Sequence, residues 1–324
     1  MRVKLERSIL KVIAYFDLFN YPVSVDEIEF FLDHRAAKSN IIFIIAQLTE
    51  KKYIFKFDGF YSLQNEPALL ERRKKGNLRA QSMLTRANKI SKFLYKFPFV
   101  RGVGISGSLS KNFADENADI DFFIITSANR LWIARTIMHL FKKLTFLLGR
   151  QHWYCMNYYI DEDALKIEEQ NIFTATELIT LKPVCGNGIM DKFFRANDWA
   201  TLYFPNYITT KSDRTHAGKG WLKKMAEWLF ENRVGDRLDN YLMKLTSKRW
   251  KHKEEERRLN MRGVRMGLKT GKHFSKPNPT HFQKKVLEQY EQRLNEVMGK
   301  VTSYRIELQG YRLQGTGYKD FGSA

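Results

Sequence analysis

The chain of 324 residues is long enough for two or three domains, and its 44% hydrophobic and 14% aromatic content is typical of a folded globular protein. The formal net charge of +20 at pH 7 favours association with polyanions, whether nucleic acid or an anionic membrane surface. Two cysteines without a Cys-x-x-Cys pair indicate neither a disulfide framework nor a zinc site. The N-terminus lacks the apolar stretch of a signal peptide, and no run approaches the roughly 20 apolar residues of a membrane span, so we expect a cytoplasmic protein without a transmembrane segment.

Residues 1–66 carry the pattern of three helices followed by a hairpin. Apolar residues recur at helical spacing over 9–19, Ser24 and Glu27 form a capping-box pattern, and 39–48 can form a third helix. Strand-like runs then flank the turn Asp58-Gly59. This order resembles a winged-helix domain. Because the third helix, SNIIFIIAQL, has little charge, we expect a structural or partner-binding role rather than reading of DNA bases.

A basic linker helix is predicted over 67–98, softened or broken at Gly76. Residues 72–96 hold nine Lys or Arg and no acid, so these side chains are expected to face solvent or substrate. The apolar positions that are expected to pack on the next domain are Leu78, Met83, Ile90 and Leu94.

The most informative motif lies in GISGSLSKNFADENADIDFFIIT, residues 104–126. A short strand is expected to lead into the turn Gly107-Ser108 and then into one or two turns of helix over 109–113, whose amide groups favour an anion. In a strand over 119–126 side chains alternate between faces, so Asp119 and Asp121 share one face. Two adjacent carboxylates repel each other unless a hard cation joins them, and Mg²⁺ prefers carboxylates, phosphate oxygens and water. The motif therefore predicts a metal site beside a phosphate-binding turn.

Gly107-Ser108 with Asp119-x-Asp121 resembles the signature of the DNA polymerase beta-like nucleotidyltransferase superfamily over roughly residues 100–160. The resemblance implies an α+β core, a small mixed sheet flanked by helices, that transfers a nucleoside monophosphate from a nucleoside triphosphate to an acceptor and releases pyrophosphate. It further implies that Asp119 and Asp121 are catalytic and ligate Mg²⁺ or Mn²⁺.

The same resemblance implies how the donor nucleotide is held. Gly107 and Ser108 would bind the phosphates of the nucleoside triphosphate, with ATP as the expected donor. Ser110 and Lys111, which follow the turn directly, are further candidates for phosphate contact.

The third carboxylate that many members of this superfamily carry on a neighbouring strand is not evident. The next strand-like run, 152–160, contains no acid, and Asn157 is the polar residue best placed to occupy or support that position. Alternatively two acids suffice, or the fold brings in Asp161, Asp163 or Glu177. Because a neutral Asn oxygen is a poorer Mg²⁺ ligand and base than a carboxylate, loss of activity in a domain that only binds is a further alternative.

Residues 99–185 are thus predicted as the nucleotidyltransferase core and 186–324 as a helical C-terminal region. The resemblance implies that such C-terminal helices help to select the acceptor. Helical patterns cover 172–181, 221–245 and 282–297. The segment MGLKTGKHFSKPNPTHF, residues 266–282, is expected to be a loop. Its lysines would suit contact with phosphate, but an ordinary surface loop is favoured. Neither His273 nor His281 has metal-ligand spacing to an acid.

The sequence predicts a metal-dependent nucleotidyltransferase whose acceptor is RNA, protein or a small molecule, and the positive charge suits a polyanionic acceptor such as RNA. The main alternative is a catalytically inactive relative that binds nucleic acid or a partner as a regulator. A role at a membrane surface is favoured least, because neither basic run, 72–96 or 244–276, shows an exposed aromatic face suited to lipid.

Overall fold

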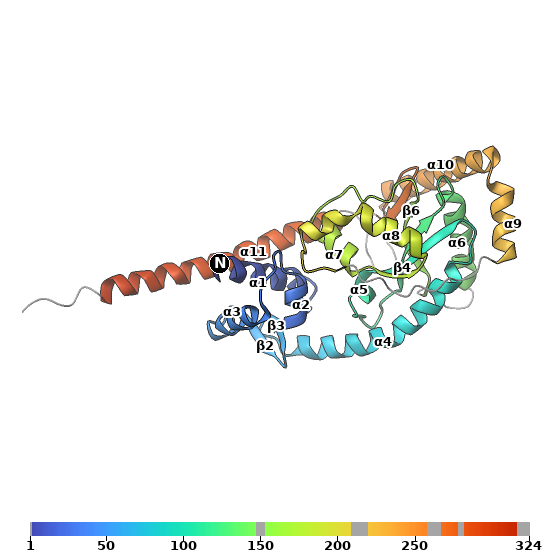
Figure 1. Ribbon diagram of the computed structural model, residues 1–324. Coiled ribbons are helices and arrows are strands. Elements are labelled where there is room, and N and C mark those ends of the chain that lie inside the picture. Colours follow the sequence, from blue (N-terminus) through green and yellow to red (C-terminus); the bar gives the residue numbers. More distant parts are fainter. Residues whose placement is uncertain (1, 147–152, 209–219, 258–266, 278–281, 316–324) are drawn as a thin grey trace, which may run out of the picture. The chain divides into compact units, whose positions relative to one another are not determined.

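Helices and strands alternate irregularly along the chain, which places it in the α+β class. The computed structural model describes residues 2–146, 153–208, 220–257, 267–277 and 282–315 (Figure 1). The chain divides into two units. The first comprises Met1–Glu71, Phe204–Asn206 and Lys284–Ala324, and the second comprises Arg72–Tyr203 and Tyr207–Gln283. Within the described ranges, no helix combines the length and apolar character needed to cross a bilayer.

The first unit begins with three helices and a small antiparallel sheet in the order β1-β3-β2 (Figure 1). Its elements near the N-terminus are α1 (Arg2–Asp17), β1 (Val23–Ser24), α2 (Val25–Phe30), α3 (Lys38–Glu50), β2 (Phe55–Phe57) and β3 (Phe60–Ser62). The predicted capping box is confirmed, because the Ser24 hydroxyl accepts from the Glu27 N–H at 3.2 Å and the Glu27 carboxylate accepts from the Ser24 N–H at 2.9 Å. The predicted hairpin is confirmed as well, with φ of +46° at Asp58 and +82° at Gly59.

Segments from distant parts of the chain complete this unit. Helix α11 (Phe282–Gly315) supplies Arg293, whose guanidinium donates to the buried carboxylate of Asp17 at 2.7 Å. The ring of Tyr290 packs on Tyr15 with 5.7 Å between centroids. The ring of Phe204 packs on the ring of Phe31, the residue that follows α2. The unit is therefore assembled from three stretches of chain.

The second unit is built on a six-stranded mixed sheet in the order β7-β4-β5-β6-β9-β8. The strands are β4 (Val100–Ser106), β5 (Asp121–Thr126), β6 (Cys155–Asp161), β7 (Lys182–Cys185), β8 (Leu268–Thr270) and β9 (Phe274–Pro277). The β5–β6 pair is parallel, and the other pairs are antiparallel. The helices are α4 (Ala68–Leu94), α5 (Gly107–Ser110), α6 (Leu131–Phe146), α7 (Ile172–Thr180), α8 (Asn187–Ala196), α9 (Trp221–Phe230) and α10 (Arg233–Glu255), with a 3-10 helix over Asp198–Leu202.

Helices cover both faces of this sheet. Helices α4 and α6 pack on one face and form the main core there with buried strand residues that include Val103, Phe122 and Ile124. On the other face the ring of Phe193, from α8, lies 4.8 Å from that of Phe123. Met190 of the same helix closely approaches the glycines of β4. A mixed sheet flanked by helices is therefore confirmed at this level of description.

Helix α4 runs without interruption through Gly76, so the predicted break is wrong. A Cβ at Gly76 would lie 2.2 Å from the ring of Phe113, which shows that glycine here makes room for a neighbour. The predicted apolar face is wrong at Leu78, which is 68% exposed, and the small residues Ala80 and Ala87 are buried in its place. Small side chains allow this helix to lie close to the sheet.

We expect Gly76→Ala to destabilise the protein by about 1–3 kcal/mol, although alanine is the better helix former. The added methyl group has no room, because Phe113 is buried and its ring also carries the guanidinium of Arg72 at 4.8 Å. Urea denaturation measures the change. The matched control is Gly188→Ala in α8, where a Cβ meets nothing within 4 Å. Equal stabilities of Gly76→Ala and wild type would contradict the account.

Two further expectations about the C-terminal half need correction. The segment predicted as a loop over 266–282 contains β8 and β9, which extend the sheet beyond β6. The helix predicted over 221–245 is interrupted after Phe230, because the side chain of Asn232 caps α10 by accepting from the N–H groups of Val234 and Gly235. Gly235 permits this break, since a Cβ there would lie 1.8 Å from the Phe230 carbonyl oxygen.

Candidate functional site

The predicted phosphate turn and one of the two predicted metal ligands meet at one end of the central strands. Ser106, the last residue of β4, pairs with Asp121, the first residue of β5, and α5 begins at Gly107. Strand β5 thus starts two residues later than predicted, and Asp119 lies in the segment just before it. Both aspartates are partly buried. Asp119 thus lies outside the strand ladder, in the segment that leads into β5.

Gly107 brings the turn directly against the carboxylate of Asp121. Its φ of +69° is a left-handed conformation that side chains disfavour. A Cβ built on Gly107 would lie 2.6 Å from Oδ2 of Asp121, closer than atoms approach without displacement. Glycine is therefore required here both for the backbone conformation and for the contact. The structure therefore places the turn and the Asp121 carboxylate side by side.

The residues after the turn hold it in place. Ser110 is buried, and its hydroxyl donates to the Gly107 carbonyl at 2.8 Å. The Lys111 ammonium donates to the same carbonyl at 3.2 Å and to the Glu177 carboxylate of α7 at 2.7 Å. Ser108 is exposed. Helix α5 is a single turn over Gly107–Ser110, not the predicted helix over 109–113. Of the residues predicted to contact phosphate, Ser110 and Lys111 thus brace the turn, whereas Ser108 faces solvent.

The neighbouring strand does not bring an acid to this end of the sheet. The β5–β6 register steps from Phe122 opposite Met156 to Phe123 opposite Tyr158, so Asn157 is the extra residue of a β-bulge. The side chain of Asn157 lies outside the described part of the structure.

Asp161 and Asp163 cannot serve as the third ligand in this arrangement. Asp161 is paired with Thr126 at the far end of β5, whereas Asp121 is paired with Cys155 at its beginning. The two ends are five residue steps apart along β5, a distance of about 17 Å at 3.3 Å per residue. Of the predicted alternatives, Glu177 is the acid that the structure brings to the turn, through Lys111.

Asp161 and Asp163 instead belong to a second group, with His273 of the β8–β9 turn. Their ligand atoms lie within 4.8 Å of one another, so this group could hold a metal ion. The fully buried Asp161 carboxylate accepts from the N–H groups of Asn129 at 3.0 Å and Asp163 at 3.1 Å, and it lies 2.9 Å from Nδ1 of His273. The same contacts tie β6 to β9 and to the segment after β5. The expectation that His273 has no acidic partner is wrong, and His281 lies outside the described residues.

A pocket of about 280 Å³ adjoins this second group. It is lined by Asn129, Asp236, Asp239, Asn240 and Lys272. Asp236 is held by the Arg130 guanidinium at 2.6 Å, and the carboxylate of Asp239 accepts from the N–H of Ile133 at the start of α6 at 2.9 Å. The local surplus of acidic groups contrasts with the basic character of the chain.

Burial raises the pKa of Asp239 to about 6 from its ordinary 3.8, although hydrogen bonds from Ile133 and Trp132 favour the charged form. The folded protein therefore binds this proton more tightly than the unfolded chain. The resulting stability is present at and below about pH 4 and is lost as the pH rises through about 6.

Asp239→Asn removes this proton equilibrium, because an amide does not ionise. Relative to wild type, we expect the variant to gain on the order of 2 kcal/mol of unfolding free energy between about pH 4 and pH 7. Urea denaturation of both proteins at the two pH values measures the change. A constant difference between them would contradict the raised pKa.

The lysines of the β8–β9 hairpin have an internal partner. Lys276 and Lys269 donate to the Glu169 carboxylate at 2.5 and 3.0 Å. Burial opposes ionisation of Glu169, but these hydrogen bonds outweigh it and lower its pKa to about 2. The expectation that this segment is a loop with lysines for phosphate is therefore not supported. The alternation of polar and apolar residues on either side of Gly271 is the sequence signal that could have indicated the hairpin.

No protein-family model, no curated protein and no solved structure matches this chain. The elements of the structure define the protein as an α+β protein with a helix-flanked mixed sheet. Any function has to be inferred from the chemistry of these sites.

Proposed function

We propose that the second unit is a metal-dependent nucleotidyltransferase, which moves a nucleoside monophosphate from a nucleoside triphosphate to an acceptor and releases pyrophosphate. The contact between Gly107 and Asp121 carries the proposal, because it sets a tight, glycine-requiring turn against a carboxylate. Phosphate oxygens bound by the turn would be next to a cation held by that carboxylate. This adjacency is what transfer from a triphosphate requires.

The residues at this end of the sheet fit a hard cation. The Asp121 carboxylate occupies the space that a side chain at position 107 would fill, and Asp119 is two residues away along the chain. Asp119 and Asp121 would hold Mg²⁺ or Mn²⁺, which supplies neutralisation of phosphate charge and orientation of the reacting oxygens when bound.

The chain's own groups hold the donor, with ATP as the expected nucleotide. The N–H groups of the turn at Gly107 and Ser108 bind its phosphates, and the exposure of Ser108 leaves room for the ligand. Ser110 positions the turn through the Gly107 carbonyl, while Glu177 holds the ammonium of Lys111 beside it. One of the two aspartates accepts the proton of the acceptor hydroxyl. The net charge of +20 supports a polyanionic acceptor such as RNA.

The first unit supports a winged-helix-like, partner-binding role in the same proposal. Its third helix, α3, exposes Ile42 and Phe43 to 50% and 54%. Apolar side chains at this position favour contact with a protein over contact with the charged groove of DNA.

A catalytically inactive, regulatory relative is the second candidate, and one observation favours it. Among the described side chains, Asp119 and Asp121 belong to no group of three acidic, His or Cys ligands, whereas Asp161, Asp163 and His273 do form one. A protein that binds a nucleotide without transferring it needs fewer ligands than a catalyst.

Pyrophosphate release and label transfer test the proposal. Wild type and the Asp119→Ala/Asp121→Ala variant are incubated with each labelled nucleoside triphosphate, Mg²⁺ or Mn²⁺, and a cell extract that supplies acceptors. The control is Glu116→Ala, because Glu116 is an exposed acid in the same loop. Transfer by wild type and by the control, but not by the double variant, supports catalysis. Metal-dependent nucleotide binding without turnover by wild type would favour the inactive relative.

A further inference from the structure

Helix α9 of the second unit has an inverted polarity. Its charged residues Lys223 and Glu227 are buried, with 4% and 8% exposure, whereas Trp221 and Trp228 are 71% and 78% exposed. Amphipathic helices of globular proteins normally bury their apolar face and expose their charges. The arrangement therefore indicates that the apolar side of α9 has a function outside the core of this unit.

The inward charges fix this orientation. The Lys223 ammonium donates to the carbonyls of Tyr95 and Val100, each at 2.7 Å. The Glu227 carboxylate accepts from the N–H of Phe99 at 2.8 Å and from the guanidinium of Arg101 at 2.6 Å. Rotating the helix to bury its tryptophans would break four charge-assisted contacts and leave two ions without partners.

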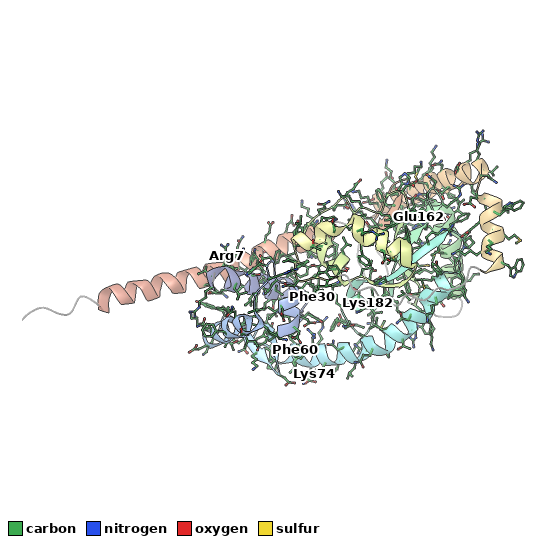
Figure 2. The ribbon with its side chains drawn as sticks, viewed as in Figure 1. Arg7, Phe30, Phe60, Lys74, Glu162 and Lys182 are labelled. Atoms are coloured by element: carbon green, nitrogen blue, oxygen red, sulfur yellow. The ribbon has the colours of Figure 1, made fainter. Side chains whose placement is uncertain are left out.

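The outward side chains form one continuous apolar stripe. The four residues Trp221, Met225, Trp228 and Leu229 are 71%, 54%, 78% and 55% exposed, and their spacing places them on one side of the helix. Side chains of large ring systems project from α9 at the edge of Figure 2. The exposed area is on the order of 500 Å², which is as large as the largest apolar patches of ordinary monomers.

The next helix exposes many basic residues. Two residues separate α9 from α10, which exposes the side chains of Arg233, Arg237, Lys244, Lys248, Arg249 and Lys251. Protein interfaces are depleted in lysine, whereas helices that lie in the lipid interface combine tryptophan on one side with lysine and arginine nearby. Indole rings also favour the depth of the lipid headgroups.

We propose that α9 is an interfacial anchor that binds the surface of an anionic lipid bilayer. Trp221 and Trp228 insert among the headgroups, and the basic side chains of α10 are attracted to the anionic lipids. The sequence alone showed no exposed aromatic face in either basic run. In the structure α9 supplies such a face, and the basic run 244–276 begins within the helix that follows it, α10. This proposal does not depend on nucleotidyl transfer.

Flotation of the full-length protein with lipid vesicles tests the anchor. Phosphatidylcholine vesicles with about 30% phosphatidylglycerol supply the anionic surface, and pure phosphatidylcholine vesicles supply the neutral one. We expect wild type to float with the anionic vesicles, and Trp221→Ser/Trp228→Ser to bind them at least about tenfold more weakly. The control Leu202→Ser removes an exposed apolar side chain elsewhere, at 81% exposure, and should bind as wild type does.

The double variant should fold, because Lys223 and Glu227 keep their contacts, and an unchanged melting temperature verifies this. Met225→Glu, which places a charge within the stripe, should weaken binding in the same way. Wild type that does not float with anionic vesicles, or a double variant that floats equally well, would overturn the proposal. If the double variant instead abolishes self-association in sedimentation while vesicles are never bound, the stripe is a protein interface and the membrane anchor is wrong.

Discussion

Gly107→Ala should reduce nucleotidyl transfer by at least about a hundredfold, together with the affinity for the donor nucleotide. The substitution strains a backbone with φ of +69° and drives a methyl group to within 2.6 Å of the Asp121 carboxylate. The turn must then move away from the aspartate, which separates the groups that hold the phosphates and the cation. Titration with ATP and Mg²⁺ measures the affinity, and label transfer measures the rate.

Two other glycines separate the causes of this effect. Gly59→Ala imposes similar backbone strain at φ of +82° but meets nothing within 4 Å. Gly188→Ala has neither strain nor a close contact. We expect Gly59→Ala to lose about 1–2 kcal/mol of stability without loss of transfer. Gly188→Ala should keep full transfer with equal or slightly higher stability, because alanine is the better helix former. Full activity of Gly107→Ala would contradict the assignment of this turn as the phosphate site.

Asp161→Ala is expected to have the largest effect on stability, a loss of about 3–5 kcal/mol. Its fully buried carboxylate accepts from the N–H groups of Asn129 and Asp163 and contacts the ring of His273. Removing it leaves these polar groups without their acceptor inside the protein. Urea denaturation at neutral pH measures the loss.

Asp163→Ala is the matched control for this prediction. Asp163 is exposed and accepts from the Asn129 side-chain amide at 3.1 Å, so its removal should cost no more than about 1 kcal/mol. Asp161→Asn should fall between the two alanine variants, because one of its oxygens remains an acceptor. Equal losses for Asp161→Ala and Asp163→Ala would show that the network contributes little.

Features that depend on neighbouring residues could be predicted from the sequence. The capping box at Ser24 and Glu27 and the turn at Asp58-Gly59 are set by chemistry within four residues, and both are confirmed. The proximity of Gly107 to Asp121 follows from a strand, a tight turn and a returning strand, which is also a local arrangement. Which acid lies near the turn was not predictable in this way, because the approach of Glu177 to Lys111 depends on how distant segments pack.

Features that depend on distant partners could not be predicted. Gly76 reads as a helix breaker until Phe113 is known to lie against it. His273 reads as a loop histidine until β9 pairs with β6 and brings it to Asp161. An amphipathic helix normally buries its apolar side, and only the contacts of Lys223 and Glu227 show that α9 faces the other way.

The position of the label in the product tests the central claim most directly. Wild type is supplied with ATP labelled on the α-phosphate, or in a parallel reaction on the γ-phosphate, together with Mg²⁺ and acceptors from a cell extract. Nucleotidyl transfer predicts that the α label enters the acceptor while the γ label leaves as pyrophosphate. Transfer of the γ label to the acceptor, or no transfer of either label despite bound ATP, would contradict the assignment of Asp119, Asp121 and the Gly107 turn as a nucleotidyltransferase site.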